Sequence, residues 1–149
     1  MNNKLILIVE DDDDDFLIFN RALKKSNCQI PVKRLSSGEE ALDYLFQHGD
    51  QVNLEHSPLP AIILLDLNMP GIGGRAVLKE TKDNEALKKI PIIVLTTSED
   101  QKDIDRCYSD GANGYIVKPA SFKGFIEAIN CLNGYWFDIS VLPNGSLIT

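Results

Sequence analysis

The chain has 149 residues, of which 44% are hydrophobic and 25% are charged, and its formal net charge is -7. A single domain of this length buries about 70% of the surface of its unfolded chain, so it needs no metal or disulfide to hold its fold. The negative charge argues against non-specific binding to nucleic acid or to an anionic membrane, because both favour a basic surface. We therefore expect a protein whose partners are other proteins, with no nucleic acid and no membrane among them.

Five apolar runs alternate with segments of helical spacing along the chain. The runs lie at 5–9, 30–35, 61–65, 90–95 and 114–117, and the helical segments at about 15–26, 37–48, 73–83, 99–110 and 121–133. Strands that are apolar throughout are buried on both faces, and strands that alternate with helices form right-handed crossovers. The pattern predicts an α/β fold, a doubly wound five-stranded parallel sheet with helices on both sides.

Cysteine and histidine residues give no sign of a disulfide framework or a metal site. Cys28, Cys107 and Cys131 cannot all pair within one chain and show no C-x-x-C spacing, which favours a reducing compartment and buried or half-buried thiols. His48 and His56 fall in the one long loop without nearby ligands, so we expect that loop to be solvated. The first apolar run is too short for a signal peptide, and no segment approaches the roughly 20 apolar residues that span a bilayer. We expect a cytoplasmic location.

Four of the five apolar runs end in polar side chains that can carry chemistry. In chain order these are Glu10 and Asp11, then Asp66, then Thr96 and Thr97, and finally Lys118. The carboxyl ends of parallel strands lie along one edge of a sheet, where ligands bind near the point at which the strand order reverses. We therefore expect residues that are far apart in the sequence to share one small site.

The chemistry of this set points to phosphate. Clustered carboxylates repel one another and need a cation, and a site with few oxygen ligands suits Mg²⁺, which keeps several waters and shares its shell with phosphate oxygens. A lysine can pair with a phosphoryl group and a threonine hydroxyl can donate to it. An aspartate can attack phosphorus and carry it as an aspartyl phosphate. The residues together predict acceptance of a phosphoryl group.

Four stretches carry a resemblance to a known family: "LIVEDD", "IILLDLNMPGIGG", "IIVLTTS" and "GYIVKP", in this order. With them the chain resembles the receiver domain of two-component response regulators, which has a flavodoxin-like (β/α)5 fold of the chemotaxis type. The resemblance covers about residues 3–133, which implies a receiver domain at 1–133 and a C-terminal extension at 134–149. It implies a signalling protein rather than an enzyme, which takes its phosphoryl group from a sensor histidine kinase and itself catalyses phosphotransfer and dephosphorylation.

At the metal site, the resemblance implies a role for each matching residue. Asp66 would be the phosphoacceptor and a Mg²⁺ ligand, and Asp11 would coordinate the ion directly. Asn68 would supply its backbone carbonyl, and Glu10 would touch the ion through water.

Around the phosphoryl group, the resemblance implies a switch. Thr96 would bind the phosphoryl group and shift inward on activation, and Tyr115 would move inward with it. Lys118 would pair with the phosphoryl group, and the peptide bond before Pro119 would be cis.

The remaining aspartates of the acidic run, at 12–15, are expected to line the mouth of the site. They would also begin the first helix, with Asp14 or Asp15 as its N-cap, because carboxylates cap free N–H groups there. Two positions depart from patterns common in the family: Thr97 replaces a small residue, and Ala120 replaces an aromatic residue that often follows Lys-Pro. These departures bear on partner surfaces rather than on the phosphorylation chemistry.

The C-terminal extension holds the only tryptophan, Trp136, between Tyr135 and Phe137. In this feature and in its long loop before the third strand, the chain is similar to single-domain regulators paired with phytochrome kinases, which implies a light-sensing pathway. Three successive aromatic residues sit poorly in water and favour a homodimer contact that strengthens on phosphorylation. The alternative is that the segment folds over its own domain. No effector domain is expected, so output would pass through contact with a downstream protein of unknown identity.

Two functions of other classes remain open. A phosphotransferase of the haloacid-dehalogenase type also forms an aspartyl phosphate, but it needs a second acid two residues after the nucleophile, where this chain has Asn68. A pseudo-receiver would bind partners without phosphorylation, but it usually lacks one of the acids or the lysine, all of which are present here.

Overall fold

The computed structural model describes residues 4–26, 28–50 and 59–143. The strands are β1 (Ile6–Val9), β2 (Val32–Leu35), β3 (Ile62–Leu65), β4 (Ile92–Thr96) and β5 (Gly114–Val117). The helices are α1 (Asp13–Lys25), α2 (Gly38–Asp50), α3 (Gly73–Asp83), α4 (Gln101–Ser109) and α5 (Phe122–Asn133), followed by the π-helical segment η1 (Gly134–Ile139).

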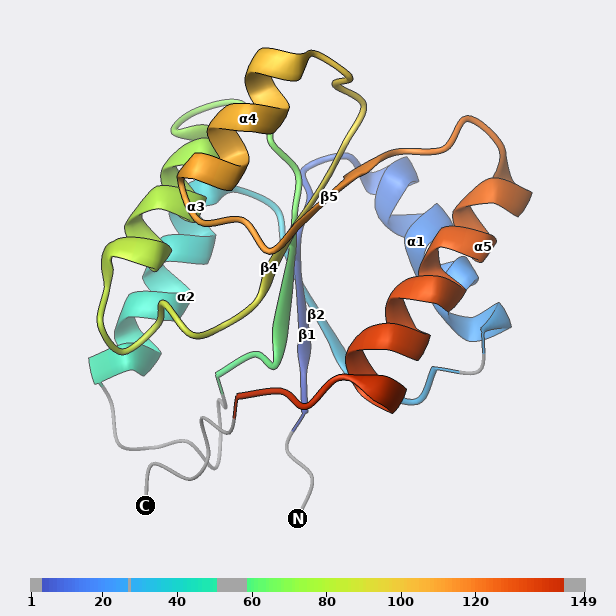
Figure 1. The fold of residues 1–149 in the computed structure, drawn as a ribbon, viewed down its shortest axis with the longest axis horizontal. Helices are drawn as coiled ribbons and strands as arrows, with labels where there is room; N and C mark the ends of the chain where they lie inside the picture. Colours follow the sequence, from blue (N-terminus) through green and yellow to red (C-terminus); the bar gives the residue numbers. More distant parts are fainter. Residues whose placement is uncertain (1–3, 27, 51–58, 144–149) are drawn as a thin grey trace.

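The strands form one parallel sheet in the order β2-β1-β3-β4-β5. Helices α1 and α5 cover one face of this sheet, and α2, α3 and α4 cover the other (Figure 1). The predicted doubly wound α/β fold is therefore confirmed. The strand order reverses between β1 and β3, so the polar residues that end these two strands lie where such folds bind ligands.

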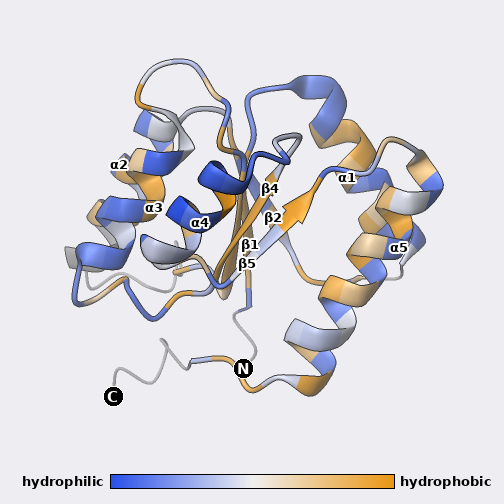
Figure 2. Cartoon of the chain, turned by 45° about the horizontal axis from the view of Figure 1, so that its top comes forward, coloured by the Kyte–Doolittle hydropathy of each residue, from blue (hydrophilic) through white to orange (hydrophobic). Residues whose placement is uncertain are grey.

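Each face of the sheet has its own apolar core. Hydrophobic residues lie along the strands and on the inward sides of the helices, while many residues on the outer sides of the helices are hydrophilic (Figure 2). The three central strands are fully buried. The edge strands β2 and β5 are only partly buried, so the prediction that all five are buried on both faces was wrong for these two. An edge strand has a neighbour on one side only, and β2 carries the charged Lys33 and Arg34.

Helix α1 begins at Asp13, about two residues earlier than the sequence predicted. Its N-cap is Asp12, whose side chain accepts a hydrogen bond of 3.0 Å from the backbone N–H of Asp15. The prediction of Asp14 or Asp15 as the cap was therefore wrong. All four successive aspartates can cap a helix, and tertiary packing of the first turn selects among them.

Three smaller predictions are also corrected. Cys107 is buried and Cys28 half-buried as expected, but Cys131 is exposed, because it lies on the outer side of α5. His48 lies within α2 rather than in a loop, and His56 lies outside the described residues. The peptide bond before Pro119 is trans, since no described peptide bond is cis.

Among the described helices none is long and apolar enough to cross a membrane.

The chain beyond α5 continues as η1 and packs in part on its own domain. Trp136 and Phe137 are half-buried against the core between the sheet, α1 and α5. Tyr135, Ile139 and Val141 are exposed. The segment thus has one side that folds over the domain and another that faces solvent.

Candidate functional site

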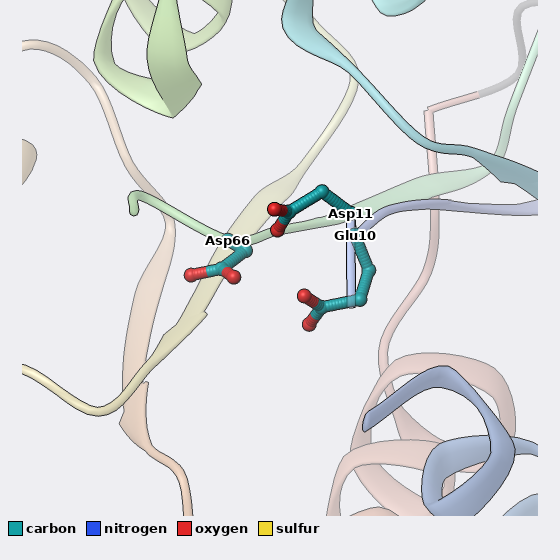
Figure 3. A group of neighbouring side chains, drawn as sticks. All are labelled: Glu10, Asp11 and Asp66. Carbon is teal, nitrogen blue, oxygen red and sulfur yellow. The ribbon is translucent and has the colours of Figure 1, made fainter. Parts of the chain in front are cut away.

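Three carboxylates meet where β1 and β3 end. Glu10 and Asp11 follow β1 and Asp66 follows β3, and one carboxylate oxygen of each lies within 4.8 Å of the others (Figure 3). Glu10 is 2% exposed and Asp66 7% exposed, whereas Asp11 is more open to solvent. The predicted acidic cluster is therefore present at the carboxyl edge of the sheet.

Lys118, at the end of β5, brings a positive charge to this cluster. Its Nζ donates to Glu10 Oε1 at 2.8 Å and to Asp15 Oδ2 at 2.7 Å, and it lies 3.5 Å from Asp66 Oδ2. The lysine side chain is largely buried. The structure thus brings Lys118 to the carboxylates as predicted, and adds Asp15 as a partner that the sequence had not singled out.

Burial and charge act in opposite directions on these groups. Burial raises the pKa of Glu10 to about 7, and the nearby Asp66 adds to this rise while Lys118 opposes it. Burial alone would lower the pKa of Lys118, but its hydrogen bonds to Asp15 and Glu10, with the charges of Glu10 and Asp66, outweigh burial and raise that pKa. Lys118 is therefore held firmly in its charged form.

Asn68 connects the acidic cluster to β4. Its backbone N–H donates to Asp66 Oδ1 at 3.2 Å, and its side-chain Nδ2 donates to Thr96 Oγ1 at 3.2 Å. Thr96 is fully buried behind Asn68, and Thr97 is the residue of β4 and its loop that lines the cleft. Asn68 thus links Asp66 to Thr96 by hydrogen bonds, a connection that the sequence had not predicted.

Tyr115 lies one step further from the carboxylates. It is half-buried on β5, and its hydroxyl donates to the backbone carbonyl of Ser98 at 2.9 Å. The Ser98 hydroxyl in turn donates to Asp103 at 2.6 Å, and Asp103 pairs with Arg75 of α3. This network joins the loop after β4 to α3 and α4, and nothing in the sequence pattern had marked Arg75 or Asp103.

The cleft at this edge has room and ligands for a small hydrated cation. It has a volume of about 220 Å³ and is lined by Glu10, Asp11, Asp12, Asp15, Asp66, Asn68, Thr97 and Lys118. The atoms that could bind a metal here are carboxylate oxygens, and the described lining residues include no sulfur or imidazole ligand. Such a set fits a hard cation of the Mg²⁺ or Mn²⁺ type, which accepts few protein ligands and retains water.

Two further residues shape the loops that carry the carboxylates. Arg34 of β2 donates through Nε to the Glu10 carbonyl at 3.0 Å and pairs with Asp13 at 2.7 Å, which ties the loop after β1 to the neighbouring strand. Gly74, in the first turn of α3, lies directly against the Asp66 backbone, where a Cβ atom would clash with the Asp66 carbonyl. Gly74 falls in the recognised stretch, while Arg34 carries no sequence signal beyond its position in an edge strand.

Known proteins are similar to this chain in sequence. The model of the response regulator receiver domain matches residues 6–130. The response regulator Rcp1 of Synechocystis sp. is 37% identical over 140 residues, which are 94% of this chain and 93% of that protein.

Two solved structures extend the similarity to three dimensions. The phosphorylated cyanobacterial phytochrome response regulator RcpA is 34% identical with a TM-score of 0.85, covering 95% of this chain and 99% of that chain. The Mn²⁺-bound form of response regulator Rcp1 is 37% identical with a TM-score of 0.83, covering 94% and 99% of the two chains. Both structures cover a larger part of this chain than the family model, which matches residues 6–130. The similarity therefore includes part of the C-terminal extension.

Proposed function

The chain belongs to the response regulator receiver domain family, and on this premise we propose that it accepts a phosphoryl group from a histidine kinase onto Asp66, in a reaction that depends on Mg²⁺. The observation that carries the proposal is the meeting of three carboxylates and one lysine at the end of β1, β3 and β5. Clustered carboxylates call for a cation, and a cation beside a lysine gives a binding place for an anionic phosphoryl group.

In the reaction, an oxygen of Asp66 attacks the phosphorus of a phosphohistidine. The new P–O bond forms as the P–N bond breaks, and the histidine nitrogen leaves with the electron pair. Asp11, Asp66 and the Asn68 carbonyl would hold Mg²⁺, with Glu10 reaching it through water. When bound, the ion neutralises charge on the phosphoryl oxygens and aligns the two partners.

The other residues respond to the phosphoryl group. Lys118 supplies a charge-assisted hydrogen bond to one of its oxygens, and the Thr96 hydroxyl donates to another. To do so, Thr96 has to break its contact with Asn68. In this structure Asn68 Nδ2 lies 3.2 Å from Thr96 Oγ1. Tyr115 then follows Thr96 inward, releasing its hydrogen bond to Ser98 and altering the surface of α4 and β5.

The pathway is proposed from the relatives. RcpA is a phytochrome response regulator, and the chain spans nearly all of it, so we place this protein downstream of a phytochrome-type histidine kinase. We propose residues 1–133 as the receiver domain and 134–149 as an extension that contacts a second copy of the chain or another protein. Output would pass through that contact to a downstream protein.

The experiment is an intact-mass measurement after incubation with acetyl phosphate and Mg²⁺. Wild-type protein is expected to gain the mass of one phosphoryl group, and Asp66→Asn is expected to gain none, because an amide is not a competent nucleophile. Asp14→Asn, the same change at an exposed position in the first turn of α1 that does not line the cleft, serves as control and is expected to behave as wild type. A full gain in Asp66→Asn would remove Asp66 from its role, and chelation of Mg²⁺ with no loss of the gain would remove the metal from the reaction.

A further inference from the structure

The Lys118 ammonium is shared unequally among three carboxylates. It lies 2.7 Å from Asp15 and 2.8 Å from Glu10, but 3.5 Å from Asp66, the residue proposed to be modified. Hydrogen bonds to an ionised partner are strongest near 2.7–2.9 Å and weaken as the distance grows. The lysine therefore lies on the α1 side of the site. Its contact with Asp15 belongs to none of the roles expected for Asp15 from the sequence.

Helix capping fixes the place of Asp15. The Asp12 side chain accepts from the Asp15 backbone N–H at 3.0 Å, and the Asp12 backbone N–H donates to Glu10 Oε2 at 3.2 Å. Glu10 Oε1 and Asp15 Oδ2 both accept from Lys118, so the four residues close a ring of hydrogen bonds. At this position in the first turn, an acidic side chain often turns back to the cap. Here it reaches across to β5 instead.

We propose that Asp15 is a positioning residue that holds Lys118 away from Asp66 in the unphosphorylated protein and so opposes the phosphorylated state. The inference rests on the proposed function of Asp66. To contact a phosphoryl group on Asp66, the ammonium moves toward β3 and gives up its short contact with Asp15. A contact made in one state and lost in the other shifts the equilibrium between them by its own free energy.

The size of the effect follows from the exposure of the pair. The Lys118 side chain is 8% exposed and that of Asp15 is 38% exposed, so the contact is partly screened by water. Glu10 keeps its own contact with Lys118 when Asp15 is changed. We therefore expect removal of the Asp15 charge to favour the phosphorylated state by roughly three- to tenfold.

The test uses beryllium fluoride, which binds at a carboxylate as a mimic of a phosphoryl group, at saturating Mg²⁺. Saturation matters because loss of a nearby carboxylate also weakens attraction for the cation. Asp15→Asn is expected to bind the mimic roughly three- to tenfold more tightly than wild type, by calorimetric titration. Asp14→Asn removes the same charge from the same turn, at an exposed position with no ion pair in the described part of the chain, and is expected to match wild type.

A double mutant separates positioning from a general charge effect. In a Lys118→Met background, Asp15→Asn is expected to change affinity for the mimic no more than Asp14→Asn does, because the group through which Asp15 acts is gone. A structural or long-range effect of Asp15 would persist in that background. Equal affinity of Asp15→Asn and wild type, or a gain that persists without Lys118, would overturn the proposal.

A second readout does not depend on phosphorylation. The ammonium protons of Lys118, followed by ¹⁵N NMR in the unmodified protein, are expected to exchange with water faster in Asp15→Asn than in Asp14→Asn. Equal exchange in the two variants overturns the contact itself. A wild-type protein that binds neither mimic nor phosphoryl group would instead refute the proposed function of Asp66, and the exchange measurement would still report on the pair.

Discussion

At the scale of single residues, the site is a balance between buried negative charge and one buried lysine. Glu10 and Asp66 are nearly inaccessible, and burial of ionised carboxylates is costly unless a cation compensates them. Lys118 offsets part of that charge, and a divalent cation would offset the rest. Residues proposed to bind the metal and residues proposed to bind the phosphoryl group are therefore expected to respond differently to substitution.

The metal side is tested at Asp11. Asp11→Asn removes one of the few proposed carboxylate ligands, so Mg²⁺ affinity is expected to fall by about tenfold or more. Even substitutions of residues that only hydrogen-bond to a metal ligand lower metal affinity by about tenfold or more. Calorimetric titration with Mg²⁺ measures this, with Asp14→Asn as the charge-matched control. An unchanged Mg²⁺ affinity in Asp11→Asn would contradict the metal assignment.

The phosphoryl side is tested at Lys118. Lys118→Ala is expected to leave Mg²⁺ binding largely intact, because a cation at the carboxylates takes over the compensation that the lysine provided. The variant lacks the proposed charge-assisted contact of Lys118 with the phosphoryl group, so phosphorylation should no longer change self-association or partner binding. Sedimentation before and after phosphorylation compares the two proteins. A response of wild-type size in the variant would show that Lys118 plays no part in the switch.

At the scale of elements, the site depends on how closely α3 approaches β3. The first turn of α3 lies against the Asp66 carbonyl, and the Gly74 N–H donates to the Leu67 carbonyl at 3.2 Å. Glycine is required at this position because any side chain would clash with the backbone of Asp66, the proposed phosphoacceptor. The first turn of α3 thus supports the backbone of Asp66.

Gly74→Ala is therefore expected to slow phosphorylation by acetyl phosphate several-fold and to lower stability by about 2 kcal/mol, as for other overpacked positions. Gly134→Ala is the matched control, since it has no atom within 4 Å of its added Cβ and an αR backbone that alanine favours. Intact-mass time courses and urea unfolding measure the two effects. Equal behaviour of the two variants would contradict the bracing role of α3.

Much of this arrangement could be predicted from the sequence, and the failures have physical reasons. Apolar runs that end in Glu10, Asp66 and Lys118 predict both the parallel sheet and the edge where these residues meet. The helix cap could not be chosen from four equivalent aspartates, and the pairing of Asp15 with Lys118 depends on that choice. Long-range contacts of Arg34 and of Arg75 likewise depend on which strands and helices become neighbours.

At the scale of the whole molecule, the C-terminal extension divides its aromatic residues between two environments. Trp136 and Phe137 pack on the domain. The Nζ atom of Lys4 lies 5.9 Å from the centre of the Phe137 ring. Tyr135 is 53% exposed and Ile139 is 75% exposed, so their apolar surface is open to a partner. Trp136 and Phe137 thus pack on their own domain, and the proposed dimer contact would involve the exposed Tyr135 and Ile139.

This division gives a paired prediction. Ile139→Ser is expected to weaken self-association of the phosphorylated protein while leaving its free energy of unfolding nearly unchanged, because the side chain is exposed. Trp136→Ala is expected to lower the free energy of unfolding by about 2 kcal/mol, because half of a large side chain leaves the core. Sedimentation and urea unfolding separate the two outcomes. If Ile139→Ser self-associates as strongly as wild type, the dimer contact proposed for the extension is contradicted.

Whether Asp66 carries the phosphoryl group is measured by locating that group in the chain. After phosphorylation by acetyl phosphate with Mg²⁺, borohydride reduces an aspartyl phosphate to homoserine, and peptide mass spectrometry then identifies the converted residue. The account predicts conversion of Asp66 alone, in the presence of Mg²⁺ and not after chelation. Conversion at Glu10 or Asp11, or no conversion at Asp66 in protein that has gained a phosphoryl group, would contradict it.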